Sequence, residues 1–66
     1  MSWYKVSQTP PKVTVLSYAG ELLSVLIGNT KYQYYANPTI YKKIEFYIKN
    51  GWYGKALKVL NQLEKL

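Results

Sequence analysis

The fold is decided by residues 31–57, KYQYYANPTIYKKIEFYIKNGWYGKAL. The tyrosine-rich beginning of this stretch favours a β-strand. Asn37 followed by Pro38 is typical of a helix start, because asparagine caps free N–H groups and proline lacks the N–H that would have no partner there. Gly51 is suited to the left-handed conformation that ends many helices. The stretch therefore predicts a strand, a helix at 37–50, and the start of a second helix.

Apolar residues recur at helical spacing in both predicted helices. The buried stripe of the first is predicted at Ile40, Ile44, Tyr47 and Ile48. The second is predicted at 52–65, where Ala56, Val59, Leu60 and Leu63 have the same spacing and lysines alternate with them. One helix is expected to cover the sheet, and the other to pack on that layer or on a partner.

Three strands are predicted within residues 13–35. Val13–Tyr18 is rich in β-branched residues, Leu22–Ile27 is continuously apolar, and the third strand is Lys31–Tyr35. Short turns containing Gly20 and Gly28 separate them, and tight turns can join only antiparallel neighbours.

Residues 1–66 are therefore predicted to form a single small α+β domain, a three-stranded antiparallel meander followed by two helices. Pro10 and Pro11 keep residues 1–12 extended as an N-terminal arm, in which Trp3 either anchors on the core or is an exposed contact residue.

The composition argues against an enzyme. Cysteine, histidine, aspartate and arginine are absent, and the only acidic residues are Glu21, Glu45 and Glu64. General acid–base and nucleophilic catalysis draw mostly on the missing residue types, and so do zinc sites. The sequence therefore predicts no catalytic site, no metal site and no cofactor. It also shows no signal peptide and no apolar run long enough to span a membrane, so a cytoplasmic location is expected.

The strong positive charge suggests an anionic partner. Nine lysines oppose three glutamates, for a net charge of +6. The alternative is a merely solubilising surface, since lysine, tyrosine, isoleucine and asparagine all have A/T-rich codons. With no arginine to read guanine, nucleic-acid binding, to RNA or DNA, would be led by phosphate contacts and weakly sequence-specific.

Aromatic residues interleaved with lysines give the candidate contact residues, because bases stack on aromatic rings between phosphate-binding lysines. Tyr32 and Tyr34 share one strand face and either stack on bases or bury against the first helix, while Trp52 either closes the core or stacks. The predicted nucleic-acid-binding residues are Lys31, Tyr35, Lys42, Lys43, Lys49, Trp52, Tyr53, Lys55 and Lys58.

A protein-interaction module is the alternative function. The apolar stripe of the second helix, broader than one small sheet can cover, would be exposed and would bind a second copy or a host protein. Its predicted interface residues are Val59, Leu60, Leu63 and Leu66.

The run Tyr32-Gln33-Tyr34-Tyr35-Ala36-Asn37-Pro38, followed by Tyr41, resembles the KTSC domain. The similarity extends to Trp3, Tyr18, Gly28, Lys49, Gly51 and Tyr53, and so covers most of the chain. This family is named for its occurrence at the C-terminus of lysyl-tRNA synthetases, and many members are short phage or bacterial proteins. The resemblance implies strands followed by a helix, a viral or microbial origin and a link to RNA. The chain departs from the family near Lys49 and in its leucine-rich C-terminal helix.

Overall fold

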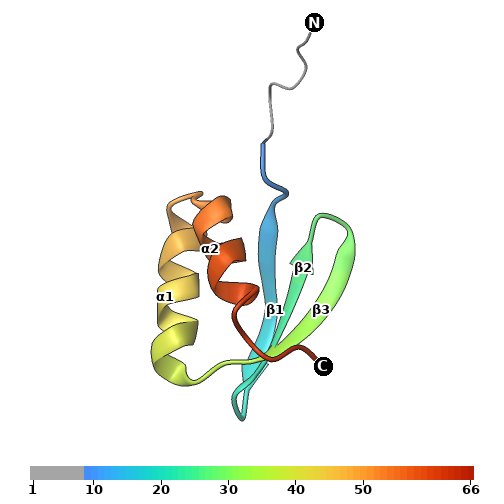
Figure 1. The fold of residues 1–66 in the computed structure, drawn as a ribbon, viewed down its shortest axis with the longest axis vertical. Coiled ribbons are helices and arrows are strands. Elements are labelled where there is room, and N and C mark those ends of the chain that lie inside the picture. Colours follow the sequence, from blue (N-terminus) through green and yellow to red (C-terminus); the bar gives the residue numbers. More distant parts are fainter. Residues whose placement is uncertain (1–8) are drawn as a thin grey trace, which may run out of the picture.

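A computed structural model describes residues 9–66 of the chain. Its elements follow one another as β1 (Val13–Ala19), β2 (Leu22–Ile27), β3 (Thr30–Tyr35), α1 (Pro38–Lys49) and α2 (Tyr53–Leu60). The strands form one antiparallel sheet in the order β1-β2-β3, and the two helices lie side by side against it (Figure 1). The predicted α+β meander followed by two helices is confirmed. Trp3 and most of the predicted arm lie outside the described residues.

The helix α1 begins as the sequence predicts. The Asn37 side chain accepts a hydrogen bond from the Ile40 N–H at 2.9 Å, and Pro38 occupies the first turn. The helix ends before Gly51, whose φ of 72° lies in the left-handed region and whose N–H donates to the Ile48 carbonyl. Local sequence therefore determines both ends of α1.

The β1–β2 turn contains two residues with positive φ. Gly20 has φ 56° and Glu21 has φ 66°. The left-handed region suits glycine but costs about 1–2 kcal/mol for a residue with a Cβ atom. Glu21 is therefore held in a strained conformation by the pairing of Ala19 with Leu22 on either side of the turn.

Replacing Glu21 with glycine is expected to stabilise the domain by about 0.5–1 kcal/mol, because the relief of strain exceeds the added entropy of the unfolded chain. Chemical denaturation would measure the change. The control Glu45→Gln removes the same charge from the surface of α1 without altering a strained backbone. An equal gain in both variants would mean that charge, and not the turn, causes the effect.

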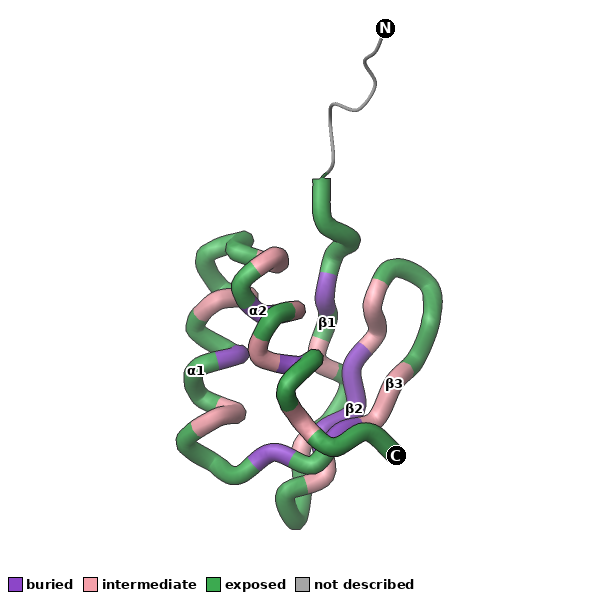
Figure 2. Tube along the Cα trace, viewed as in Figure 1, coloured by how far each residue is buried: buried purple, intermediate pink, exposed green. Residues whose placement is uncertain are grey.

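One face of the sheet carries the core. The rows Val15–Val25–Tyr32 and Tyr18–Leu23–Tyr34 run across the three strands on this face, with the register of β1 shifted at Leu16. They pack with residues of both helices in a cluster whose buried members are Val13, Leu23, Val25, Tyr34, Ala36, Ile44, Ala56 and Leu60 (Figure 2). Of the two alternatives for Tyr34, burial against the helices is the one observed, since only 4% of the residue is exposed.

Tyr18 of β1 contacts Tyr41 of α1 and the residue Ala36 that precedes this helix. Its hydroxyl donates to the Ala36 carbonyl at 2.7 Å, and its ring stacks on Tyr41 with the centroids 4.0 Å apart. Burial raises the pKa of Tyr18 above its usual value, and the nearby Glu21 carboxylate and Tyr41 add to the shift. Burial, and to a lesser degree Tyr32, also raises the pKa of Tyr34. Both tyrosines therefore favour the neutral form in the folded state.

The domain is expected to lose stability as the pH rises through about 10, the ordinary pKa of tyrosine. A raised pKa in the folded state means that the unfolded chain releases these protons first, so the stabilisation is complete below that pH and declines above it. Thermal melts between pH 8 and 11 would measure the decline. A Tyr18→Phe/Tyr34→Phe variant should show a flatter profile, and an unchanged profile would contradict the assignment.

The C-terminal segment departs from the prediction of a helix at 52–65. The helix α2 ends at Leu60, and residues 64–66 instead run beside β3. The Tyr35 N–H donates to the Glu64 carbonyl at 3.0 Å, and the Leu66 N–H donates to the Gln33 carbonyl at 2.9 Å. The prediction was wrong here because the free backbone groups at the edge of β3 are satisfied by this segment, an interaction that local helical spacing does not reveal.

Candidate nucleic-acid interface

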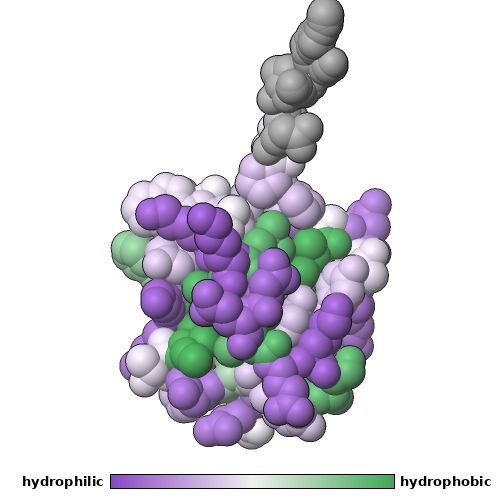
Figure 3. All heavy atoms as spheres, in the orientation of Figure 1, coloured by the Kyte–Doolittle hydropathy of each residue, from purple (hydrophilic) through white to green (hydrophobic). Residues whose placement is uncertain are grey.

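The helices α1 and α2 form an antiparallel hairpin whose outer surface carries most of the lysines. Of the predicted contact residues, it brings together Lys42, Lys43 and Lys49 on α1 with Lys55 and Lys58 on α2, and all five are exposed. Figure 3 shows hydrophilic side chains on this part of the molecule, as elsewhere on the same face, with hydrophobic side chains between them. We call these five lysines with Phe46 and Trp52 the helical surface.

The position of each lysine on α1 follows from the helical repeat. Ile44 is the fully buried residue of this helix. Lys42 and Lys49 lie seven positions apart, two turns of the helix, and both are on the side away from Ile44. Lys43 lies four positions before Tyr47, so these two side chains are neighbours on the flank of the helix.

An aromatic cluster lies where α1 meets α2. The Phe46 and Trp52 ring centroids are 5.8 Å apart with the planes nearly perpendicular, at 81°. The Tyr47 ring is 6.2 Å from Trp52 and 6.0 Å from Phe46. Phe46 remains 54% exposed and Trp52 45% exposed. The cluster thus offers solvent two large aromatic surfaces that their contacts hold in place.

A lysine covers this cluster from α2. The ammonium nitrogen of Lys55 lies 5.1 Å from the centre of the Trp52 ring and 6.0 Å from that of Tyr47. At these distances the cation is attracted to the aromatic faces. Lys42 and Lys43 lie four and three positions before Phe46, so they are next to the same cluster on α1. Positive charge and exposed aromatic surface therefore coincide at this end of the helical hairpin.

The remaining predicted contact residues lie in different parts of the structure. Lys31 and Tyr35 are exposed, but they belong to β3 and lie on the sheet face opposite the core, away from the helical surface. Tyr53 is half-buried and packs against the core. Trp52, for which both core and contact were possible, does not belong to the core cluster; it packs on Phe46 and Tyr47 and remains 45% exposed.

Phe46 is the functional candidate that the sequence analysis missed. The sequence does indicate that Phe46 is exposed, because it lies two positions from both Ile44 and Ile48 and therefore on the solvent side of α1. A large apolar residue at such a position is informative when a second exposed aromatic residue lies beside it. That neighbour, Trp52, is visible only in the structure.

The predicted interface stripe is not a continuous exposed surface. Leu60 is completely buried in the core, so its assignment to an interface was wrong. Val59 and Leu63 are half-buried and pack against the core, and only Leu66 is largely exposed, at 60%. The stripe is interrupted because the chain turns at Asn61 and returns to β3.

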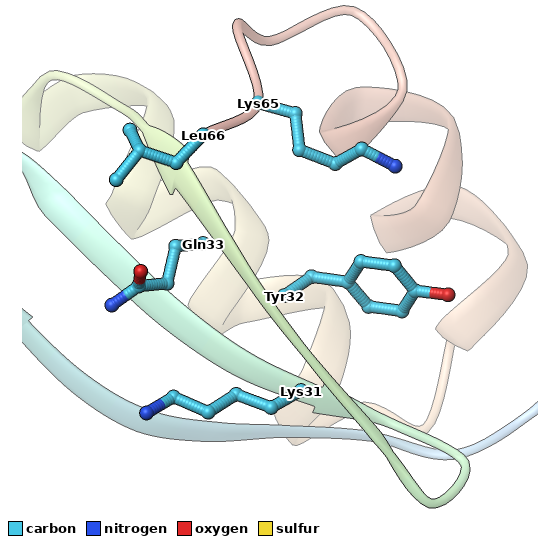
Figure 4. A pocket seen from close by; sticks show the side chains of 5 residues that line it. All are labelled: Lys31, Tyr32, Gln33, Lys65 and Leu66. Atoms are coloured by element: carbon cyan, nitrogen blue, oxygen red, sulfur yellow. The ribbon is translucent and has the colours of Figure 1, made fainter.

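A shallow depression of about 450 Å³ lies beside β3. It is lined by Lys31, Tyr32, Gln33, Lys65 and Leu66. Figure 4 shows Lys31, Gln33 and Leu66 on one side of β3, with Tyr32 and Lys65 on the other. The Lys65 ammonium group lies 4.8 Å from the centre of the Tyr32 ring. The two lysines thus point away from each other and do not converge on one ligand.

Two further properties bear on function. Within residues 9–66, no group of three or more acidic, histidine or cysteine side chains is placed to hold a metal ion. None of the helices in this part of the chain has the length and apolar character needed to cross a membrane.

No protein-family model matches the chain, and no curated protein or solved structure is significantly similar to it. The resemblance to the KTSC domain therefore stays a prediction.

Proposed function

We propose that this protein is a non-enzymatic nucleic-acid-binding module that uses the helical surface. The observation that carries the proposal is the Lys55 ammonium group, 5.1 Å from the ring of the half-exposed Trp52, beside the exposed Phe46. Lysines supply attraction to phosphates, and exposed aromatic rings supply stacking on bases. Both groups occur together on α1 and α2, and this combination favours a single-stranded ligand whose bases are accessible.

The chemistry of the helical surface implies modest sequence specificity. Lysine contacts phosphate as a point charge and, unlike arginine, does not form a planar two-pronged contact with a base. Stacking on Phe46 and Trp52 tolerates every base, because each base has an aromatic face. We therefore propose a phosphate-led, weakly specific binder with a cytoplasmic location. The KTSC resemblance, with its link to a tRNA-handling enzyme, makes RNA the first ligand to test.

A fluorescence-anisotropy titration with labelled single-stranded RNA and DNA at about 50 mM salt tests the proposal. If the five lysines of the helical surface each neutralise one phosphate, the logarithm of the binding constant should fall against that of salt with a slope of about −3 to −4. Tryptophan emission should also be quenched on binding in a Trp3→Phe background, in which Trp52 is the only tryptophan. Absence of binding to both nucleic acids at this salt concentration would overturn the proposal.

Removing the exposed aromatic rings separates the contribution of stacking to the binding affinity from the contribution of charge. A Phe46→Ser/Trp52→Ser variant keeps every lysine, so it should bind single strands about 10-fold or more weakly, since each stacked base contributes about 1–3 kcal/mol. Its salt slope should stay unchanged, because no charge is lost. Circular dichroism would verify that the variant is folded.

A further inference from the structure

The sheet face opposite the core carries apolar side chains that are partly exposed, together with polar ones. We define the open face by Leu22, Leu26, Lys31, Gln33, Tyr35 and Leu66, which no described helix covers. The residues of β1 that pair on the same side are Thr14, Ser17 and Ala19. Tyr35 is 49% exposed and Leu66 is 60% exposed, whereas Leu22 and Leu26 are half-buried. In its middle, Ser24 is buried and accepts a hydrogen bond from the Gln33 side chain at 3.2 Å. Such partly exposed apolar side chains are typical of an interaction site.

Charges of opposite sign occupy the two ends of the open face. Lys31 lies at one end, next to the β2–β3 turn, where the Lys12 carbonyl accepts a hydrogen bond from the Gly28 N–H. Two of the three glutamates lie at the other end. The Glu64 carbonyl accepts from the Tyr35 N–H, and the Glu21 carbonyl accepts from the Ala36 N–H. Glu64 lies two residues before Leu66 in the extended C-terminal segment and therefore on the same side, so it supplies the negative charge at this end.

The two ends are too far apart to neutralise each other within one chain. Lys31 and Tyr35 are four residues apart on β3, or about 13 Å at ~3.3 Å per residue. In a second copy turned end over end, Glu64 would lie over Lys31 of the first copy. Lys31 of the second copy would likewise lie over Glu64 of the first. A two-fold axis running across the strands near Gln33 produces this arrangement, and a two-fold interface uses the same surface of both partners.

We propose that two copies of this chain associate through their open faces in this end-over-end orientation, with Lys31 of each copy close to Tyr35 and Glu64 of the other. An axis parallel to the strands would instead place ends of like charge together, which is unfavourable. Stacked sheets lie ~10 Å apart, close enough for the leucines and Tyr35 to interdigitate. The inference does not rest on the proposed function, because the helical surface stays outside the interface.

The size of the open face indicates a weak dimer. Three strands and the C-terminal segment, at about 4.8 Å spacing and about 20 Å long, give a face of roughly 20 Å by 20 Å. Stable complexes bury about 800 Å² on each partner, so this face is at the small end of specific interfaces. The expected dissociation constant is on the order of 10–500 μM.

Sedimentation equilibrium on nuclease-treated protein, from about 10 μM to about 1 mM, tests the proposal through charge reversal. Lys31→Glu and Glu64→Lys should each weaken dimerisation about 10-fold, because each places like charges together between the copies. The double variant should restore association to within about 3-fold of the original. Lys58→Glu and Glu45→Lys, which make the same changes on the helices, should leave the dissociation constant unchanged.

A second pair of variants tests the apolar part of the interface. Leu66→Glu should weaken dimerisation about 10-fold, whereas Phe46→Glu, which changes a similarly exposed apolar residue on α1, should not. A protein that remains monomeric at about 1 mM would overturn the proposal. So would a dimer that is insensitive to Leu66→Glu, or a Lys31→Glu/Glu64→Lys double variant that is no better than the single variants.

Discussion

Replacing Leu60 with lysine is expected to abolish folding. Leu60 is completely buried between α2 and the sheet, so the change removes a large apolar side chain and leaves an ammonium group without water or a partner. Loss of the leucine packing alone costs about 2–5 kcal/mol, and the buried charge adds several more. A single core of this size rarely supplies more than about 3–5 kcal/mol, so the folded state should no longer be populated. Circular dichroism and dispersion of amide NMR signals would measure the loss.

The matched control is Leu66→Lys, on the same apolar stripe of the sequence. Leu66 is 60% exposed, so its replacement should change the free energy of unfolding by no more than about 0.5 kcal/mol. If Leu60→Lys instead unfolded cooperatively near the wild-type temperature, Leu60 would have to lie on the surface, as its spacing in the sequence suggested. The two variants thus discriminate between the stripe predicted from sequence and the core found in the structure.

Replacing Lys42, Lys43 and Lys55 together with glutamine is expected to weaken single-strand binding about 30- to 100-fold at low salt. These three lysines surround the aromatic cluster, and each contact with a phosphate adds attraction through the release of a bound counterion. The salt slope should become smaller in magnitude by about 2, or about 0.7 for each lysine removed. The anisotropy titration, repeated at several salt concentrations, gives both quantities.

A control variant that loses the same number of positive charges shows whether the loss of affinity comes from the helical surface or from the net charge of the protein. Glutamine at Lys12, Lys31 and Lys65 also removes three positive charges, all of them outside that surface. This variant should lose less than about 5-fold in affinity and keep most of its salt slope. Equal losses in the two triple variants would mean that nucleic acid is attracted by the whole protein, and the helical surface would not be the binding site.

The candidate site was predictable in part. The five lysines of the two helices were identified from composition and spacing, because helical periodicity separates them from the apolar stripe. Trp52 was named as a candidate because it is an aromatic residue between lysines, with a core position as the alternative. The predicted set also contained Lys31 and Tyr35, which the structure places on a different face. Spacing along one element cannot show which elements share a surface. The pairing of Phe46 with Trp52 was missed for this reason, since the two residues belong to different segments.

Local sequence accounts for the features that depend on neighbouring residues. It determined the strand Leu22–Ile27, the start of α1 at Asn37 and Pro38, and the stop at Gly51. In each case the cause is local: β-branched or apolar composition, a side chain that caps the adjacent backbone, or a backbone conformation open to glycine.

The path of the C-terminal segment depends on contacts between residues that are distant in the chain. Helical spacing continues to Leu63, yet α2 ends at Leu60 and residues 64–66 pair with β3. The edge of a strand far away in sequence offers backbone hydrogen bonds to this segment, and the core removes Leu60 from water. Both effects act between residues distant in the chain, and for this reason they override the local preference for a helix.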